Sequence, residues 1–194
     1  MTEYLLLFAS TVLVNNFVLS RFLGLCIFFG VSKSFDASVG MGVALTAVMT
    51  IVGIINYLIY HLILVPLGVE FFTTLVFVLV VASVVQLLEV ITRRYLPNLY
   101  QLWGVYLILI ATNCVVLAVP LLNAANHYTF MKSIIHSIGA GAGFALALIL
   151  MSSIREKLAR ADVPKAFQGL GIAFVTAGLL ALAFLGFSGM IPME

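Results

Sequence analysis

The sequence predicts an all-α integral membrane protein of six transmembrane helices, arranged as two inverted three-helix repeats with the first and fourth helices broken. Of the 194 residues, 64% are hydrophobic and 8% are charged, whereas a soluble domain carries about 25% charged residues. A soluble fold of this size has no means of hiding so much apolar surface. Two short internal sequence matches predict the repeats. We expect one transmembrane domain over residues 1–194, with repeats at about 4–92 and 99–191.

Six segments are long and apolar enough to cross a hydrocarbon core of about 30 Å, which takes about 20 residues of helix. The predicted segments are Tyr4–Val31, Ala37–Val65, Phe71–Thr92, Leu99–Leu122, Met131–Ile154 and Gly169–Ile191. The connections between them carry turn residues or charge, as at Pro66-Leu67-Gly68 and Arg93-Arg94. These interruptions define the expected ends of the helices.

The distribution of basic residues predicts the orientation, because cytoplasmic loops are enriched in Lys and Arg. The connections on one side contain Lys33, Arg93, Arg94, Arg155, Lys157, Arg160 and Lys165. Those on the opposite side contain only Lys132. We therefore expect the basic side to face the cytoplasm and both termini to lie outside. No basic run with interleaved aromatic residues is present, so the expected surroundings are the lipid bilayer and not nucleic acid.

The two internal matches predict an inverted repeat. Residues 15–19 (Asn-Asn-Phe-Val-Leu) match residues 113–117 (Asn-Cys-Val-Val-Leu), and residues 38–42 match residues 137–141. The third and sixth segments show no convincing match. Because each repeat holds an odd number of spans, the second copy must lie upside down in the membrane. Glycines at 40, 42, 139, 141, 143, 169 and 171 permit close backbone approach, which predicts tight helix packing.

The chain has two cysteines, Cys26 and Cys114, and both lie in predicted membrane segments. Free cysteines often serve as small buried hydrophobic residues, which is one interpretation. A disulfide finds little support, because an apolar helix bundle does not need such a crosslink. An iron–sulfur cluster normally takes four thiolates. This chain would therefore supply half of the ligands, and a second protein would have to supply the others.

Unbroken helices would hold the two cysteines at different depths. At 1.5 Å per residue, Cys26 would lie about 33 Å from the outer side and Cys114 about 23 Å from the cytoplasmic side. Only interrupted helices bring both to one level. The polar pairs Asn15-Asn16 and Thr112-Asn113 are the expected interruptions, because asparagine side chains can satisfy backbone groups freed inside protein. The alternative is two intact helices with asparagines bonded across the bundle.

Few ionisable residues lie within the predicted spans. Glu89 precedes Arg93 by four residues on one helix face, so we expect an ion pair near the cytoplasmic boundary. A role of Glu89 on a proton or sodium path is the alternative, since ionisable groups in the membrane are often functional. The three histidines lack metal-ligand spacing, and we interpret them as packing or interface residues.

Several stretches resemble the family of the A subunits of Rnf complexes, and together they span essentially the whole chain. The first-helix signature is residues 14–19 (Val-Asn-Asn-Phe-Val-Leu) followed by Phe22-Leu23-Gly24-Leu25-Cys26. The other similar stretches are Thr112-Asn113-Cys114, residues 154–158, Asp162-Val163-Pro164, Thr176-Ala177-Gly178-Leu179 and Gly186-Phe187-Ser188-Gly189. A related membrane component of the sodium-pumping NADH:quinone reductase tends to carry Glu-Asn where this chain has Asn15-Asn16. One departure from the family is Ile27, where many members have proline.

The resemblance implies one component of a bacterial inner-membrane complex that exchanges electrons between ferredoxin and NAD and moves sodium ions or protons. It also implies a homologous neighbour, the Rnf E subunit, that shares a [2Fe–2S] cluster held by two cysteines from each chain. Cys26 and Cys114 would be the ligands here, with Gly24, Leu25 and Asn113 around them. The B, C, D and G subunits would carry flavins and iron–sulfur clusters. The residues themselves leave open a stand-alone secondary transporter and a structural membrane anchor.

Overall fold

The computed structural model describes residues 2–68, 70–95, 109–110, 112–161, 164 and 168–187, and every regular element within these residues is helical. The first predicted segment consists of α1 (Thr2–Ala9), a π-helix (Ser10–Val14), a non-helical stretch and α2 (Leu25–Val31). The remaining elements are α3 (Phe35–Ile59), a π-helix (Tyr60–Leu64), α4 (Val65–Leu67), a 3₁₀ turn (Glu70–Phe72), α5 (Thr73–Tyr95), α7 (Cys114–Ala125), α8 (Phe130–Leu158) and α9 (Leu170–Leu185).

Three of these helices are long and apolar enough to cross a membrane, at Phe35–Leu64, Thr73–Arg94 and Phe130–Leu158. They correspond to the second, third and fifth predicted segments. Three shorter apolar helices cover Glu3–Val14, Cys114–Ala125 and Leu170–Leu185. The membrane character of the chain is therefore confirmed. Parts of the fourth and sixth predicted segments, residues 99–108 and 188–191, lie outside the described residues.

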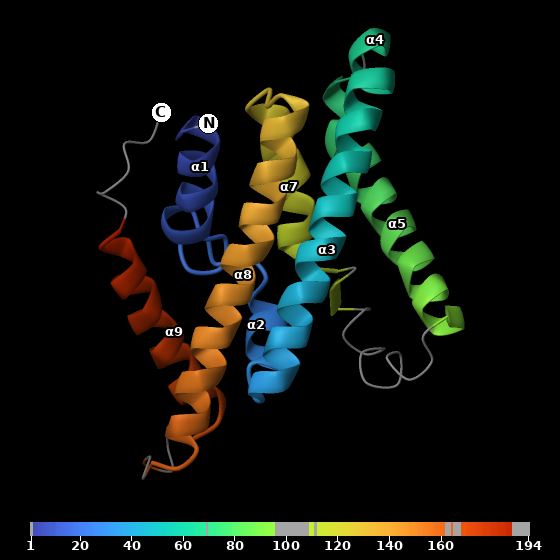
Figure 1. Ribbon diagram of the computed structural model, residues 1–194. Helices are drawn as coiled ribbons and strands as arrows, with labels where there is room; N and C mark the ends of the chain where they lie inside the picture. The colour runs from blue at the N-terminus through green and yellow to red at the C-terminus, as the bar shows by residue number, and fades with distance from the viewer. Residues whose placement is uncertain are drawn as a thin grey trace.

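The antiparallel helices α3 and α8 pack side by side at the centre of the fold (Figure 1). A Cβ atom on Gly42 would lie 2.6 Å from the Cβ of Ala145, and one on Gly141 would lie 2.7 Å from the Cα of Thr46. These two contacts are reciprocal, because residues 42 and 46 correspond to residues 141 and 145 at the 99-residue offset of the predicted repeat. Reciprocal pairing is what a two-fold relation between two similar surfaces produces.

The opposite face of α8 packs against the first segment. A Cβ on Gly139 would lie 3.2 Å from the Cβ of Thr11, and one on Gly143 would lie 3.2 Å from the backbone of Val12. Tight packing is therefore confirmed for these glycines and for Gly42 and Gly141. It is wrong for Gly169 and Gly171, where a Cβ would meet no described atom within 4 Å. Gly169 instead has a φ of +87° in the turn before α9.

In Figure 1, α5 lies beyond α3 and α9 lies beyond α8. Large apolar side chains on both helices are exposed, among them Leu79, Val90, Leu179 and Leu182. Such surface is costly in water and is expected where a helix faces lipid or a neighbouring protein. The side of α9 toward the fold is narrow and built from small residues such as Ala173 and Ala177, which are buried.

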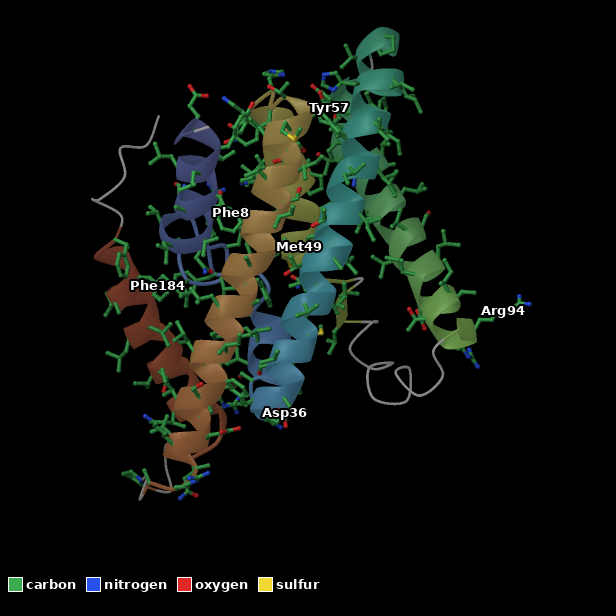
Figure 2. The ribbon with its side chains drawn as sticks, viewed as in Figure 1. Phe8, Asp36, Met49, Tyr57, Arg94 and Phe184 are labelled. Carbon is green, nitrogen blue, oxygen red and sulfur yellow. The ribbon has the colours of Figure 1, made fainter. Side chains whose placement is uncertain are left out.

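Most basic residues that the structure describes lie toward one end of the bundle, with Arg21 and Lys132 as exceptions. Figure 2 shows Asp36 and Arg94 at that end, and Tyr57 at the opposite end. Arg155 and Lys157 lie in the last turn of α8, which ends on the same side as α5 (Figure 1). The connections that are rich in Lys and Arg in the sequence therefore lie at one end of the fold.

Candidate functional site

The first break separates the π-helix at Ser10–Val14 from α2 and runs through Asn15 to Gly24. Asn16 is fully buried at its start. Its amide nitrogen donates to the carbonyl oxygen of Gly143 on α8 at 2.7 Å and to that of Val12 at 3.2 Å. Its amide oxygen accepts the backbone N–H groups of Val18 and Leu19. Asn16 therefore uses both ends of its amide to stabilise unwound backbone, as the sequence predicts for this position.

Further bonds within the break satisfy more of its backbone groups. The hydroxyl of Ser20 donates to the carbonyl of Val14, and the backbone N–H of Leu23 donates to that of Phe17. Asn15 is half-buried, and its backbone N–H donates to the carbonyl of Ser10. Residues 16–19 of the break are buried, so this part of the irregular backbone is enclosed by protein, as is required at membrane depth.

The second break lies at Thr112–Asn113, where α7 begins with Cys114. Asn113 is the N-cap residue, and its side-chain oxygen accepts the backbone N–H of Val115 at 3.0 Å. This is the usual way in which asparagine starts a helix. Thr112 is exposed, and its hydroxyl faces the carbonyl of Leu109 at 3.4 Å. The predicted interruption at Thr112–Asn113 is confirmed, although the residues directly before Leu109 are outside the described chain.

The side-chain nitrogen of Asn113 is buried and has no hydrogen-bond partner among the described residues. The residue is only 2% exposed, so water does not reach this donor. A buried amide donor without an acceptor costs about 1–3 kcal/mol. Such a group in a native fold calls for an explanation, such as an ion, a cofactor or a functional contact that lies outside the chain.

The two breaks meet at Gly24, the residue that precedes α2. A Cβ on Gly24 would lie 2.9 Å from the side-chain oxygen of Asn113 and 3.0 Å from a methyl group of Val115. It would also lie 2.6 Å from the ring of Phe144. Gly24 has a φ of +76°, which favours glycine independently of the crowding. The first turns of α2 and α7, which carry Cys26 and Cys114, are therefore neighbours.

Both cysteines are free thiols, and both are exposed on this chain. The interpretation of them as small buried hydrophobic residues is therefore wrong. Leu25, between Gly24 and Cys26, is half-buried. Cys114 lines a mostly apolar hollow of about 310 Å³ between α5 and α7, together with Val78, Ala82, Thr112, Leu117 and Leu121. The thiol of Cys114 is thus open to a partner that enters this hollow from the side.

The chain supplies few other metal ligands near the thiols. In the part of the chain that the structure describes, no group of three or more His, Cys, Asp or Glu side chains is placed to hold a metal ion. Two thiols are half the number that an iron–sulfur cluster normally needs. The donor set fits half of such a site, provided that a second protein brings further thiolates.

The predicted pair of Glu89 and Arg93 lies on α5, away from the meeting point of the breaks. Glu89 is half-buried and Arg93 is exposed. No contact described in the structure tests their pairing or a role in ion transfer, so both remain predictions.

Two other polar contacts near the site were not expected from residue type. Arg155 on α8 donates from Nη1 to the carbonyl of Phe29 and to the hydroxyl of Ser32, each at 2.9 Å, and so holds the end of α2. The carboxylate of Glu156 accepts the backbone N–H of Phe35 at 3.1 Å. The only feature of the sequence that pointed to Arg155 and Glu156 was the stretch at residues 154–158, which resembles the family.

A second polar cluster joins the last part of α7 to the first part of α8. The side-chain oxygen of Asn123 lies 2.6 Å from Nδ1 of His136, and its nitrogen donates to the hydroxyl of Ser133 at 2.8 Å. The packing role expected of His136 agrees with this buried position. Nothing in the sequence pattern pairs Asn123 with His136, because they are 13 residues apart across a turn.

Comparisons with known proteins agree with this architecture. The family model described as "Rnf-Nqr subunit, membrane protein" matches residues 4–191. Over 193 residues, and over all of both chains, the sequence is 61% identical to the A subunit of the "Proton-translocating ferredoxin:NAD(+) oxidoreductase complex" of Clostridium ljungdahlii. With the same coverage it is 54% and 52% identical to proteins of Tolumonas auensis and Aliivibrio salmonicida, each named as the A subunit of an "Ion-translocating oxidoreductase complex". The chain therefore belongs to the Rnf-Nqr family of membrane subunits.

Proposed function

We propose that this chain is the A subunit of an ion-translocating ferredoxin:NAD oxidoreductase complex and that Cys26 and Cys114 hold half of a [2Fe–2S] cluster. A homologous protein, corresponding to the Rnf E subunit, would provide the other two thiolates. The B, C, D and G subunits would carry the flavins and the other clusters. The observation that supports this proposal best is the contact of Gly24 with Asn113 and Val115, which makes the first turns of α2 and α7 neighbours.

The chemistry of the donor set supports a shared site. Each thiol follows a break in its helix by no more than two residues, and both are exposed on the isolated chain. A cluster bound there would supply one-electron transfer within the membrane. The hollow beside Cys114 leaves that side of the thiol open to side chains of the neighbouring protein. A chain with only two thiols has no complete site without that neighbour.

The residues around the thiols keep the site dry and hold its shape. Phe28, Val115 and Phe144 are buried directly behind the two helix starts. Their apolar side chains exclude water, so a change of charge at the thiols acts through a low local dielectric constant. Asn16 and Asn113 hold the backbone that leads into each helix. The proposed role of the chain is therefore to position the ligands, with the sites for ferredoxin and NAD on other components.

We also propose that six spans form two inverted repeats. The reciprocal contacts of Gly42 with Ala145 and of Gly141 with Thr46 support this arrangement. So does the equivalence of the two breaks, since Asn15-Asn16 in the first repeat matches Asn113-Cys114 in the second. The basic end would face the cytoplasm of a bacterial inner membrane, with both termini outside.

Ion movement would be coupled to the redox state of the shared site. The relatives are named as ion-translocating, and the Clostridium ljungdahlii protein as proton-translocating. In our proposal, the added negative charge on reduction is balanced by a sodium ion or proton, or by a movement of the helices that carry the thiols. The half-helices α2 and α7 are the elements whose positions would respond.

The test is EPR spectroscopy of the purified complex after reduction, comparing the native complex with Cys26→Ser and Cys114→Ser. We expect each serine variant to assemble, to lose one [2Fe–2S] signal and to lose ion uptake driven by reduced ferredoxin. Thr112→Ser, two residues before Cys114 and without a thiol, is the matched control and should keep the signal. An unchanged spectrum in both cysteine variants would refute the proposal. Full activity without the thiols would indicate a structural anchor, and solute uptake by the single chain in liposomes a transporter.

A further inference from the structure

Of the side chains that the structure describes, two carry a buried polar atom without a hydrogen-bond partner: the oxygen of Asn56 and the nitrogen of Asn113. Asn56 lies on α3, and its nitrogen donates to the carbonyl of Val52. Asn113 lies directly before Cys114 and against Gly24. The unpartnered donor is thus at the point where the two thiol-bearing helices begin.

The orientation of the Asn113 amide is fixed by its oxygen. That oxygen accepts the backbone N–H of Val115 at 3.0 Å and lies 2.9 Å from the position that a Cβ on Gly24 would take. The nitrogen therefore has little freedom to turn toward another acceptor. With 2% exposure, the residue also has no access to water. Neither thiol accepts this bond in the structure, so the acceptor has to arrive with a bound centre, and sulfur in thiolate form accepts hydrogen bonds.

Asn16, at the matching break, shows that burial alone does not explain the unpartnered donor. Its nitrogen reaches two carbonyl oxygens and its oxygen accepts from two backbone N–H groups. If Asn113 served only to begin α7, a serine would cap the helix without leaving a buried N–H unsatisfied and without burying a charge. Helix capping therefore does not account for the side-chain N–H donor of Asn113.

We propose that the Asn113 side-chain nitrogen donates a hydrogen bond to a sulfur atom of the shared centre and raises its reduction potential. This inference rests on the proposed function, because it needs a cluster at Cys26 and Cys114. Reduction adds negative charge to the sulfur atoms, and a hydrogen-bond donor stabilises the reduced state more than the oxidised state. Hydrogen bonds to sulfur are one of the means by which proteins tune cluster potentials.

The experiment is an EPR-monitored redox titration of the whole complex. Asn113→Ser keeps an N-cap oxygen and removes the amide donor, so the signal should remain and the midpoint potential should fall. Asn113→Asp keeps the cap, removes the donor and adds negative charge, so the potential should fall further. Asn56→Ser is the matched control, since it changes the other buried asparagine with an unpartnered atom. That variant should titrate at the wild-type potential.

An Asn113→Ser complex that titrates at the wild-type potential would overturn the inference while leaving the proposed function intact. Absence of any [2Fe–2S] signal that depends on Cys114 would remove the proposed function itself. If Asn113→Ser fails to assemble the cluster, the inference is tested on the wild-type complex instead. With asparagine labelled by ¹⁵N at the side-chain amide, a hyperfine coupling to the reduced cluster supports the inference, and no such coupling refutes it.

Discussion

The two helix breaks of this protein are built differently, although both depend on asparagine. The first extends from Asn15 to Gly24, and Asn16 and Ser20 bond its backbone groups, while Asn16 also bonds to Gly143 on α8. The second is short, relies on one N-cap bond from Asn113 and leaves a buried donor unpaired. The side-chain amide of Asn16 in the first break is bonded at both ends, whereas the second break has a buried donor that none of the described residues satisfies.

This difference suggests two roles: the first break supports the structure, and the second belongs to the proposed binding site. The long break interrupts the first segment, which then continues as α2 with Gly24 directly before its start (Figure 1). The short break places Cys114 at the start of α7, beside an open hollow. Changes in the first break should therefore act mainly on stability, and changes in the second mainly on the properties of the bound centre.

The largest effect should come from Gly24→Ala, because Gly24 is where the two breaks touch. The new Cβ would collide with the Phe144 ring and with Asn113, and alanine is strained at a φ of +76°. Strain and overpacking together should destabilise the complex by roughly 2–6 kcal/mol. Thermal dissociation in detergent, followed by size-exclusion chromatography, would measure it.

Gly68→Ala is the matched control for this prediction. Gly68 has a similar φ of +65°, but a Cβ there would meet no described atom within 4 Å. It should show the backbone strain alone, about 1–3 kcal/mol. Equal effects of the two substitutions would mean that the contact between the breaks contributes nothing.

The next largest effect distinguishes the asparagines directly. Asn16→Ala leaves the carbonyl of Gly143 and the N–H of Val18 without their partners, and each buried group costs about 1–3 kcal/mol. Asn113→Ala loses one helix cap, worth about 1 kcal/mol. We therefore expect the Asn16 variant to dissociate at the lower temperature. The reverse order would contradict the assignment of the first break as scaffold.

A smaller effect should follow from loosening the α3–α8 pair, which supports both breaks. Gly42→Ala and Gly141→Ala should each destabilise by about 1–3 kcal/mol, because each adds a methyl group to a closed helix contact. Similar losses in the two variants would agree with a two-fold relation. Gly171→Ala, with no described atom near its Cβ, should have no such effect. The measurement is again thermal dissociation.

The smallest effect is expected at the start of α1, far from either break. Lys132 and Glu3 form an ion pair at 3.6 Å, but the side chains are 38% and 80% exposed. Exposed pairs contribute about 0–1 kcal/mol. Glu3→Gln should therefore leave both thermal stability and the EPR spectrum unchanged. A clear loss would show that the first segment depends on this contact as well as on Asn16.

The sequence was sufficient to predict the membrane class, three uninterrupted spans and both breaks. Apolar length identifies the spans, and the asparagines mark where a helix can be interrupted, although Asn56 within the unbroken α3 shows that a buried asparagine does not by itself require a break. The tight glycines were also predictable, because residues 42 and 141 fall on the repeated motif. Gly169 and Gly171 show the limit of that reasoning, since spacing alone does not say whether a glycine faces a neighbour.

The pairing of distant polar groups could not be predicted from the sequence. Gly24 meets Asn113, Arg155 holds the end of α2, and Asn123 meets His136 only because of how the helices pack. Periodicity gives the face of a helix but not its partner. The unpartnered nitrogen of Asn113 is likewise invisible in the sequence, because residue type does not show which bonds are made.

The most direct test of the account is the position of the Cys26 and Cys114 sulfur atoms in an experimental map of the assembled complex. We predict that both border one iron-containing density at the starts of α2 and α7, with two thiolates of a neighbouring protein completing it. Sulfur atoms on separate faces of the chain, with no iron beside either, would contradict it.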